Sequence, residues 1–423
     1  MKKVDQFIIF MLLIGVFFLR YIKVFYEQWY ILDVFLLIYV FVNLVQISKK
    51  SFGMYLWYFI SVCIFMVCVS LNIMKFGAGK VFWDNIMMAL MPITLIVYFS
   101  YLNQKYSFDI LLRTCRKVII FLNVYFWINF PIIVMQFITG SFMMGRFLSW
   151  GMFNFDHMTG FMGPFGTGIL NVFWTSLLIG NLVFYLITRN KKWFLILLLE
   201  FPIMLLLSYL NENKAFIPTV ILFVSVISGY VFICNKITVK AFVKFVFLSA
   251  LGIMIGFIMY ESIEIVKEQV DNLIEIALDF DTNAALNTHN ERAYLNYLAF
   301  KYYDAAGLGL GINNIDMKTQ VIHKNLGINS FSLMSIQGGI WYYLVVLNVY
   351  VLITVGALKR KFDIHAVSLY IIFLVLFSYL SFVTQPFRDH YTMFMIAMLI
   401  LFVALFMKKV NATETENTTV DKK

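Results

Sequence analysis

The stretch that decides the fold is VIIFLNVYFWINFPIIVMQFIT, residues 118–139, which contains no charged side chain. An α-helix of about 20 apolar residues spans a hydrocarbon core about 30 Å thick. Inside lipid the backbone has to satisfy its own hydrogen bonds, so an uninterrupted block of this length indicates a helix rather than a barrel strand. The segment therefore predicts a membrane-spanning helix.

The whole chain has the composition of a membrane protein. Of its 423 residues, 62% are hydrophobic and 13% are charged, and the mean hydropathy is +0.84, whereas soluble domains carry about 25% charged residues. No small-residue cleavage site follows Met1-Lys2-Lys3, so we interpret the first apolar segment as a retained helix. The predicted fold is an all-α polytopic membrane protein with about twelve transmembrane helices. The predicted spans are 6–26, 29–47, 52–73, 84–102, 118–139, 166–187, 193–210, 215–233, 241–260, 329–355, 365–384 and 390–407.

The distribution of basic residues predicts the orientation. With both termini inside, most of the 33 lysines and arginines fall in inside loops, each of which carries at least two. Lys/Arg bias in short loops sets orientation, so we expect both termini to be cytoplasmic and the protein to lie in the cytoplasmic membrane. The net charge of +10 then reflects orientation and not nucleic-acid binding, which needs a basic groove-sized domain.

One long polar segment interrupts the spans. Residues 261–328 hold ten acidic and five basic side chains, the reverse of the inside loops, and predict a large helical extracytoplasmic loop. Within it Thr288 and Glu291 have capping-box spacing, and Gly307 is placed to end the helix that follows. The predicted division is 1–260 for the first nine spans, 261–328 for the loop, 329–407 for three further spans, and 408–423 for a disordered cytoplasmic tail.

Two cations among the apolar blocks are candidate anion ligands. Arg292 lies in the first turn of the loop helix, where free N–H groups and the helix dipole favour an anion; alternatively it pairs with Glu291, Asp281 or a lipid phosphate. Lys214 lies in a short outer turn with Asn211 and Glu212. Charged residues at such depth are commonly functional, although the lysine ammonium can equally snorkel to water.

Other polar residues lie in the remaining outer loops. Residues 145–168, GRFLSWGMFNFDHMTGFMGPFGTG, combine Arg146, Asp156 and His157 with aromatic rings of the kind that stack on sugars. Either Asp156 or His157 is a candidate base or a structural residue. Arg388 pairs with Asp389 or binds a ligand, and His323 is a base or a surface residue. No metal-ligand spacing and no G-x-x-x-x-G-K-[S/T] motif occurs, so we expect no metal and no cofactor.

Three stretches together resemble one family, the Wzy-type O-antigen or capsular polysaccharide polymerases, with their relatives the O-antigen ligases. They are FDHMTGFMGPFGTGILNVFW (155–174), YLNENKAFIPTVIL (209–222) and NERAYLNYLAFKYYDAAGLGLGINN (290–314). The chain departs from the family pattern in INSFSLMSIQGGIW (328–341), which keeps Asn329 but has Ile328 where the family has His.

The resemblance implies a C-type membrane glycosyltransferase that joins oligosaccharide repeat units carried on undecaprenyl pyrophosphate. It implies partners of three kinds: that lipid-linked oligosaccharide, membrane lipids, and a chain-length regulator protein. Arg292 and Lys214 would hold the pyrophosphate, and His323, Glu212 or Asp156 would be the base. Substrate contacts would come from Arg388, Asn211, Asn329, Arg146 and His157. Two alternatives stay open: a ligase that transfers glycan to a lipid or wall acceptor, and a polysaccharide flippase, which usually shows repeated halves.

Overall fold

The structure is a computed structural model, and the helices that it describes lie mostly in the first 221 residues of the chain. The described residues are 1–14, 17, 35–36, 38–39, 42–43, 52–76, 94–95, 97–99, 101–140, 142–143, 158–163, 167–211, 216, 219–221, 261, 267, 394–399, 401–402, 404–406 and 408–409. Within these ranges the chain is helical apart from turns, and no strand occurs. The all-α class is therefore confirmed for this part of the chain.

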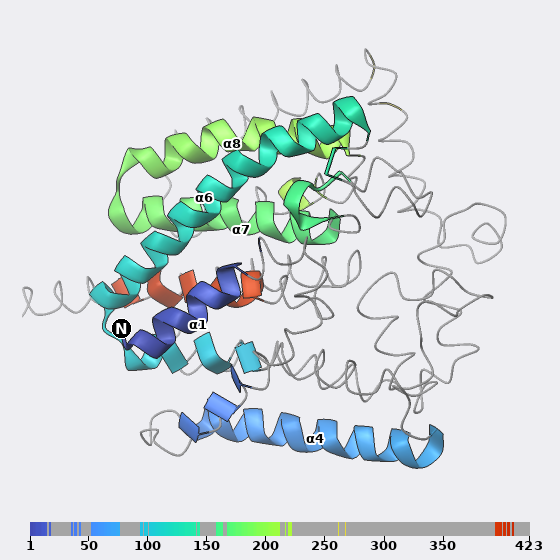
Figure 1. The fold of residues 1–423 in the computed structure, drawn as a ribbon. Helices are drawn as coiled ribbons and strands as arrows, with labels where there is room; N and C mark the ends of the chain where they lie inside the picture. The colour runs from blue at the N-terminus through green and yellow to red at the C-terminus, as the bar shows by residue number, and fades with distance from the viewer. Residues whose placement is uncertain are drawn as a thin grey trace, which may run out of the picture.

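The described helices are arranged around α6, α7 and α8 (Figure 1). Their bounds are Lys3–Ile14 for α1, Phe52–Phe76 for α4, Phe108–Thr139 for α6, Thr167–Thr188 for α7 and Lys191–Leu210 for α8, with the 3₁₀ turn η5 at Gly160–Met162. Three of them, α6, α7 and α8, are long and apolar enough to cross a membrane. In Figure 1, α7 and α8 run side by side, while α4 lies along the far edge of the bundle.

The predicted spans agree with α4, α7 and α8 in position. The span 166–187 matches Thr167–Thr188 to within a residue at each end, and 193–210 matches Lys191–Leu210 to within two. The span 52–73 is the first part of α4, which continues to Phe76. The predicted span 118–139 lies within α6, and the remaining predicted spans are described only in part or not at all. The predicted loop 261–328, apart from residues 261 and 267, lies outside the described residues.

The start predicted for the span 118–139 is wrong, because α6 begins ten residues earlier, at Phe108. Its first three turns are amphipathic: Leu111 and Cys115 are buried, whereas Arg113 and Arg116 are exposed. Helical spacing of this kind supports a helix at a water interface, but the charges lower the local hydropathy. A helix of 32 residues is about 48 Å long, so α6 extends well beyond a hydrocarbon core about 30 Å thick.

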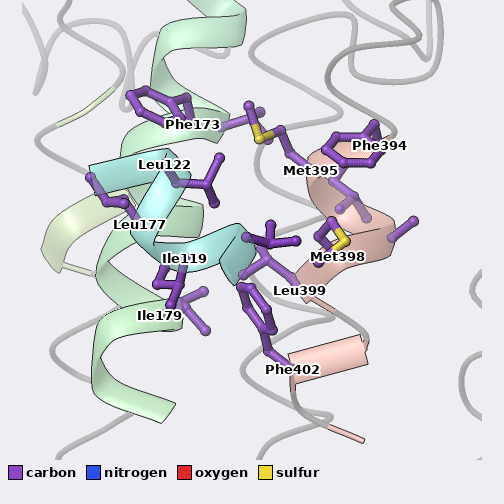
Figure 2. Close-up of a cluster of buried hydrophobic side chains, with 14 of the residues drawn as sticks. Ile119, Leu122, Phe173, Leu177, Ile179, Phe394, Met395, Met398, Leu399 and Phe402 are labelled. Atoms are coloured by element: carbon purple, nitrogen blue, oxygen red, sulfur yellow. The ribbon is translucent and has the colours of Figure 1, made fainter. Parts of the chain in front are cut away.

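Helix α7 lies at the centre of the described bundle. Of the apolar part of α7, 83% is buried inside the protein, against 28% for α8, so α8 is peripheral. Figure 2 shows Phe173 and Leu177 of α7 packed with Ile119 and Leu122 of α6 and with the helical residues near the C-terminus. The contacting C-terminal side chains are Phe394, Met395, Met398, Leu399 and Phe402. The last helical residues are therefore part of the same core as α6 and α7.

The first and last described residues lie at the same end of this bundle. The backbone N–H of Lys2 donates to the Tyr106 hydroxyl over 2.9 Å. Lys408 donates to the backbone oxygens of Asn103 and Tyr106, and Lys409 donates to that of Ile187, near the end of α7. One end of the bundle thus gathers residues 2, 106, 187 and 408, and the loop 158–163 lies at the opposite end of α6.

Candidate functional site

The candidate site is a loop held against the far end of α6. Residues 158–163, which include η5, connect the loop after α6 to α7, and they pack on the last three turns of α6. They carry the Thr-Gly pair of the sequence stretch 155–174. We call this arrangement of residues 158–163 with Asn129, Gln136 and Asn211 the loop clasp.

Two amide side chains of α6 bind the loop through its backbone. Asn129 Nδ2 donates to the Thr159 oxygen over 3.2 Å, and Asn129 Oδ1 accepts from the Phe161 N–H over 2.8 Å. Gln136 Oε1 accepts from the Gly160 N–H over 2.9 Å. Asn129 and Gln136 are seven residues apart, about two helical turns, so they share one face of α6.

Two glycines give the loop its conformation, and one of them also allows its close approach. Gly160 has φ +65°, and a Cβ there would lie 2.0 Å from Asn129 Oδ1. Gly163 has φ +75°, and no atom lies within 4 Å of the position that a Cβ would take. Only glycine adopts such positive φ values without strain. The Thr159 hydroxyl donates to the Gly163 backbone oxygen and closes the turn. The glycine at 160 is therefore required by both conformation and space.

Asn211 joins the end of α8 to the clasp. It is the residue after Leu210, its backbone N–H donates to the Leu207 oxygen, and its side chain is fully buried. Its Nδ2 donates to the Met158 oxygen over 3.4 Å, while its Oδ1 has no hydrogen-bond partner among the described residues. A buried carbonyl oxygen without a partner is a rare and unfavourable state, so Oδ1 is an acceptor that can take a further donor.

Of the predicted site residues, the structure describes only Asn211. The other predicted residues lie outside the described part of the chain: Arg146, Asp156, His157, Glu212, Lys214, Arg292, His323, Asn329 and Arg388. Among the residues that are described, no group of three or more His, Cys, Asp or Glu side chains is placed to hold a metal ion. The described clasp residues are amides, a hydroxyl and backbone groups, which bind hydrogen-bonding ligands and do not transfer protons.

Sequence reasoning missed Asn129 and Gln136. Their signal was present, since two amides seven residues apart interrupt an otherwise apolar face of the segment 118–139. The sequence does not show that the partner of this face is the backbone of residues 158–163, because that pairing depends on the tertiary arrangement.

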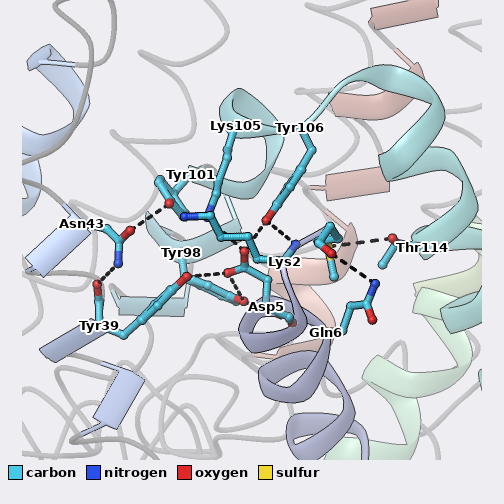
Figure 3. Close-up of polar contacts among 11 residues, drawn as sticks. Lys2, Asp5, Gln6, Tyr39, Asn43, Tyr98, Tyr101, Lys105, Tyr106 and Thr114 are labelled. Carbon is cyan, nitrogen blue, oxygen red and sulfur yellow. Dashed lines mark hydrogen bonds and ion pairs between the residues drawn. The ribbon is translucent and has the colours of Figure 1, made fainter.

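A second polar cluster, also missed, lies at the opposite end of the bundle (Figure 3). Asp5 of α1 is fully buried and accepts four side-chain hydrogen bonds. Lys105 Nζ lies 3.0 Å from Oδ2, and the donating hydroxyls belong to Tyr39 (2.9 Å), Tyr98 (3.3 Å) and Tyr106. A carboxylate with a cation and several donors is stable when buried, so this cluster joins three segments that are distant in sequence.

The electrostatics of this cluster favour a charged lysine. Burial lowers the pKa of Lys105, but hydrogen bonds to Tyr101 and Asp5 and the Asp5 charge outweigh that effect, so the pKa of Lys105 is raised. Burial, followed by the hydrogen bond to Asp5, raises the pKa of Tyr106. Both groups therefore keep their protons at neutral pH. The cluster has a structural role, because it holds together three segments that are distant in sequence.

No protein-family description matches this chain, and no curated protein does.

Proposed function

We propose that this protein is a membrane glycosyltransferase that polymerises oligosaccharide repeat units carried on undecaprenyl pyrophosphate. The observation that carries the proposal is the hydrogen bond from Asn211 to the Met158 backbone. This contact joins two of the three stretches on which the resemblance rests, 155–174 and 209–222. In the chain, Met158 follows Asp156-His157 directly, and Asn211 directly precedes Glu212. The candidate bases Asp156 and Glu212 are thus close in sequence to the two residues that form this hydrogen bond.

The charge of the opposite end supports the orientation that this function needs. Lys2 and Lys105 lie there, together with the exposed basic residues at the start of α6 and in the turn between α7 and α8. These are Arg113, Arg116, Lys117, Arg189, Lys191 and Lys192. Because Lys and Arg are retained on the cytoplasmic side, we assign that end to the cytoplasm and the loop clasp to the outer face of the cytoplasmic membrane.

The chemistry proposed for the outer face needs no nucleotide. A hydroxyl of the incoming repeat unit attacks the anomeric carbon of the growing chain; the bond from that carbon to the pyrophosphate oxygen breaks, and a base accepts the hydroxyl proton. Undecaprenyl pyrophosphate leaves with its negative charge. Fixed cations that stabilise this charge are the largest catalytic requirement, and Arg292 and Lys214 are the proposed cations.

Asn211 has a defined place in this scheme. Its free Oδ1 is a hydrogen-bond acceptor, and sugar hydroxyls are donors, so Asn211 is proposed to position the acceptor sugar. A single buried hydrogen bond of this kind contributes about 0.5–1.5 kcal/mol. Replacement of Asn211 by Leu removes this acceptor together with the hydrogen bond to Met158, so it should raise the substrate concentration that the enzyme needs and also loosen the loop clasp.

The test is the length of surface glycan in cells that carry a deletion of the gene, complemented by wild type or by Arg292→Ala. Loss of long chains with accumulation of single lipid-linked repeat units supports polymerisation. Long chains that remain on the lipid carrier indicate a ligase instead. Unchanged glycans in the deletion strain contradict both. Wild-type chain length with Arg292→Ala contradicts the role of Arg292, provided the variant is present in the membrane at the wild-type level.

A further inference from the structure

A carboxyl group lies inside the apolar part of the described bundle. Glu200 is near the middle of α8 and is fully buried, although most of the neighbouring α8 side chains are exposed. Its Oε2 accepts a hydrogen bond from Asn181 Nδ2 of α7 over 3.2 Å, whereas its Oε1 has no hydrogen-bond partner in the described part of the chain. Ionisable groups at this depth are unfavourable and commonly functional.

The amide donors around Glu200 are all in use. Asn181 and Asn123 exchange two hydrogen bonds between α7 and α6, with lengths of 2.9 and 3.1 Å. The second N–H of Asn181 goes to Glu200, and the second N–H of Asn123 goes to the Ile119 oxygen over 2.6 Å. A side-chain amide has two donors, so this chain of hydrogen bonds has no further donor for Oε1.

No cation among the described residues faces the carboxyl group. The indole of Trp127 on α6 and the amide of Asn181 on α7 face it, while Asn123 of α6 contacts Asn181. Tyr185, one turn further along α7, packs on Phe194 instead. The basic residues of these helices are exposed at one end, and the nearest on α8, Lys192, is eight residues from Glu200, a rise of about 12 Å.

An ionised carboxylate in this position would be poorly compensated. Transfer of a carboxylate from water to an apolar interior is unfavourable by several kcal/mol unless a cation or several donors compensate for it. Here one amide N–H and the neighbouring indole are the available donors. A neutral carboxyl needs only the hydrogen bond from Asn181, and the proton removes the charge.

We propose that Glu200 is a proton-binding site inside the membrane-spanning bundle, with the proton as its ligand. The neutral carboxyl attaches α8 to the Asn123–Asn181 pair, and loss of the proton weakens that attachment. The site is one side chain from the lipid, because Trp127, which lies against the carboxyl, is 42% exposed. Pro202, two residues further along α8, lacks the N–H that would bond to the Leu198 oxygen. The half of α8 that leads to Asn211 can therefore move when the attachment weakens.

Infrared spectroscopy of the full-length protein in lipid nanodiscs tests the protonation state. The difference between wild type and Glu200→Gln at neutral pH should contain the C=O band of a protonated carboxyl, and that band should shift in D₂O. Glu200→Asp, which keeps a carboxyl on a shorter side chain, should retain such a band at a changed frequency and replaces the glutamine variant if that variant does not fold. Carboxylate bands in place of the C=O band at neutral pH would overturn the proposal.

Reaction with N,N′-dicyclohexylcarbodiimide gives a second readout. The carboxyl proton moves to a nitrogen of the reagent, a carboxyl oxygen bonds to its central carbon, and the adduct rearranges to an N-acylurea without loss of atoms. The α8 peptide should gain the mass of one reagent molecule. This labelling should fall as the pH rises and should be at least about tenfold weaker in Glu200→Gln, a difference that corresponds to about 1.4 kcal/mol.

The matched variant for this reaction is Trp127→Ala. This substitution removes the side chain between the lipid and the Glu200 carboxyl, so it should increase the rate at which the carbodiimide labels Glu200. If neither wild type nor Trp127→Ala reacts at any pH, the proposal is wrong, because a protonated carboxyl so close to lipid is accessible to this apolar reagent. Labelling that does not change with pH also contradicts it. Neither readout uses glycan synthesis, so the outcome is independent of the proposed function.

Discussion

Replacement of Gly160 by Ala should open the loop clasp, and the structure allows the size of the effect to be estimated. At φ +65° a residue other than glycine is strained by about 1–2 kcal/mol. The new Cβ would lie 2.0 Å from Asn129 Oδ1, so the Asn129 amide has to move. It then loses its hydrogen bonds to Thr159 and Phe161, each of which contributes about 0.5–1.5 kcal/mol. The predicted total is roughly 2–5 kcal/mol.

The Asn129→Ala background offers the matched control. There Gly160→Ala keeps the backbone strain but meets no Asn129 amide, so the difference between its effects in the two backgrounds isolates the clash, which we estimate as roughly 1–3 kcal/mol. Gly163→Ala is not matched in strain, because Gly163 has φ +75° and ψ 165°, a region that is essentially confined to glycine.

Limited proteolysis of the protein in detergent micelles measures the opening of the loop. Chymotrypsin cleaves after Phe161, and cleavage follows the population of the open form when opening is fast relative to cleavage. We expect Gly160→Ala to speed this cleavage about tenfold more in the wild-type background than in the Asn129→Ala background, since about 1.4 kcal/mol corresponds to a factor of ten. An equal effect of Gly160→Ala in the two backgrounds would refute this reasoning.

Three further predictions concern the rest of the described bundle. Asp5→Ala leaves the Lys105 ammonium without its carboxylate and should lower the free energy of unfolding by about 3–5 kcal/mol. Denaturant titration in micelles measures this free energy, and Asp5→Asn should lower it less than Asp5→Ala. Because the pKa of Lys105 is raised in the fold, its stabilisation is complete at neutral pH and is lost as the pH rises above the ordinary lysine value. The unfolding midpoint should therefore fall in alkali, and Lys105→Met should reduce that fall. Gly180→Leu should destabilise by about 1–3 kcal/mol through overpacking, since even a Cβ would lie 2.6 Å from Ile119 Cδ1 and 3.1 Å from Phe402 Cε2. Gly180→Ala should change thermal stability little, because the Ile119 tip can move and Ala favours a helix by about 1 kcal/mol.

The sequence predicted the helices α7 and α8 closely because lipid imposes a length on them. An apolar run has to satisfy its backbone within about 20 residues, so hydropathy alone places Thr167–Thr188 and Lys191–Leu210 to within two residues. The same criterion fails at Phe108, because the first turns of α6 lie in an interface where one face is charged. Helical periodicity and not hydropathy carries the signal there.

The candidate site was predicted less completely, for a different physical reason. The Thr-Gly pair at 159–160 and Asn211 stand out in the sequence because they are polar or flexible among apolar residues. Their partners do not stand out in the same way. Asn129 binds backbone groups of the loop, and a backbone acceptor has no sequence signature. Glu200 lies within the predicted span 193–210, where a single acid does not change the hydropathy of an apolar block.

The polar side chains of α6 fix the rotation of this helix in the bundle. Apolar packing against lipid-like side chains discriminates weakly between rotations, because lipid tails are as apolar as the helices. Asn123 pairs with Asn181 on one face of α6, whereas Asn129 and Gln136 bind the loop from another. At 3.6 residues per turn, Asn123 and Asn129 point about 120° apart, and Asn129 and Gln136 about 20° apart. A rotation of α6 would therefore break both sets of hydrogen bonds at once. The pair inside the membrane and the loop clasp at its end thus hold α6 in one orientation, and that orientation brings residues 158–163 to Asn211.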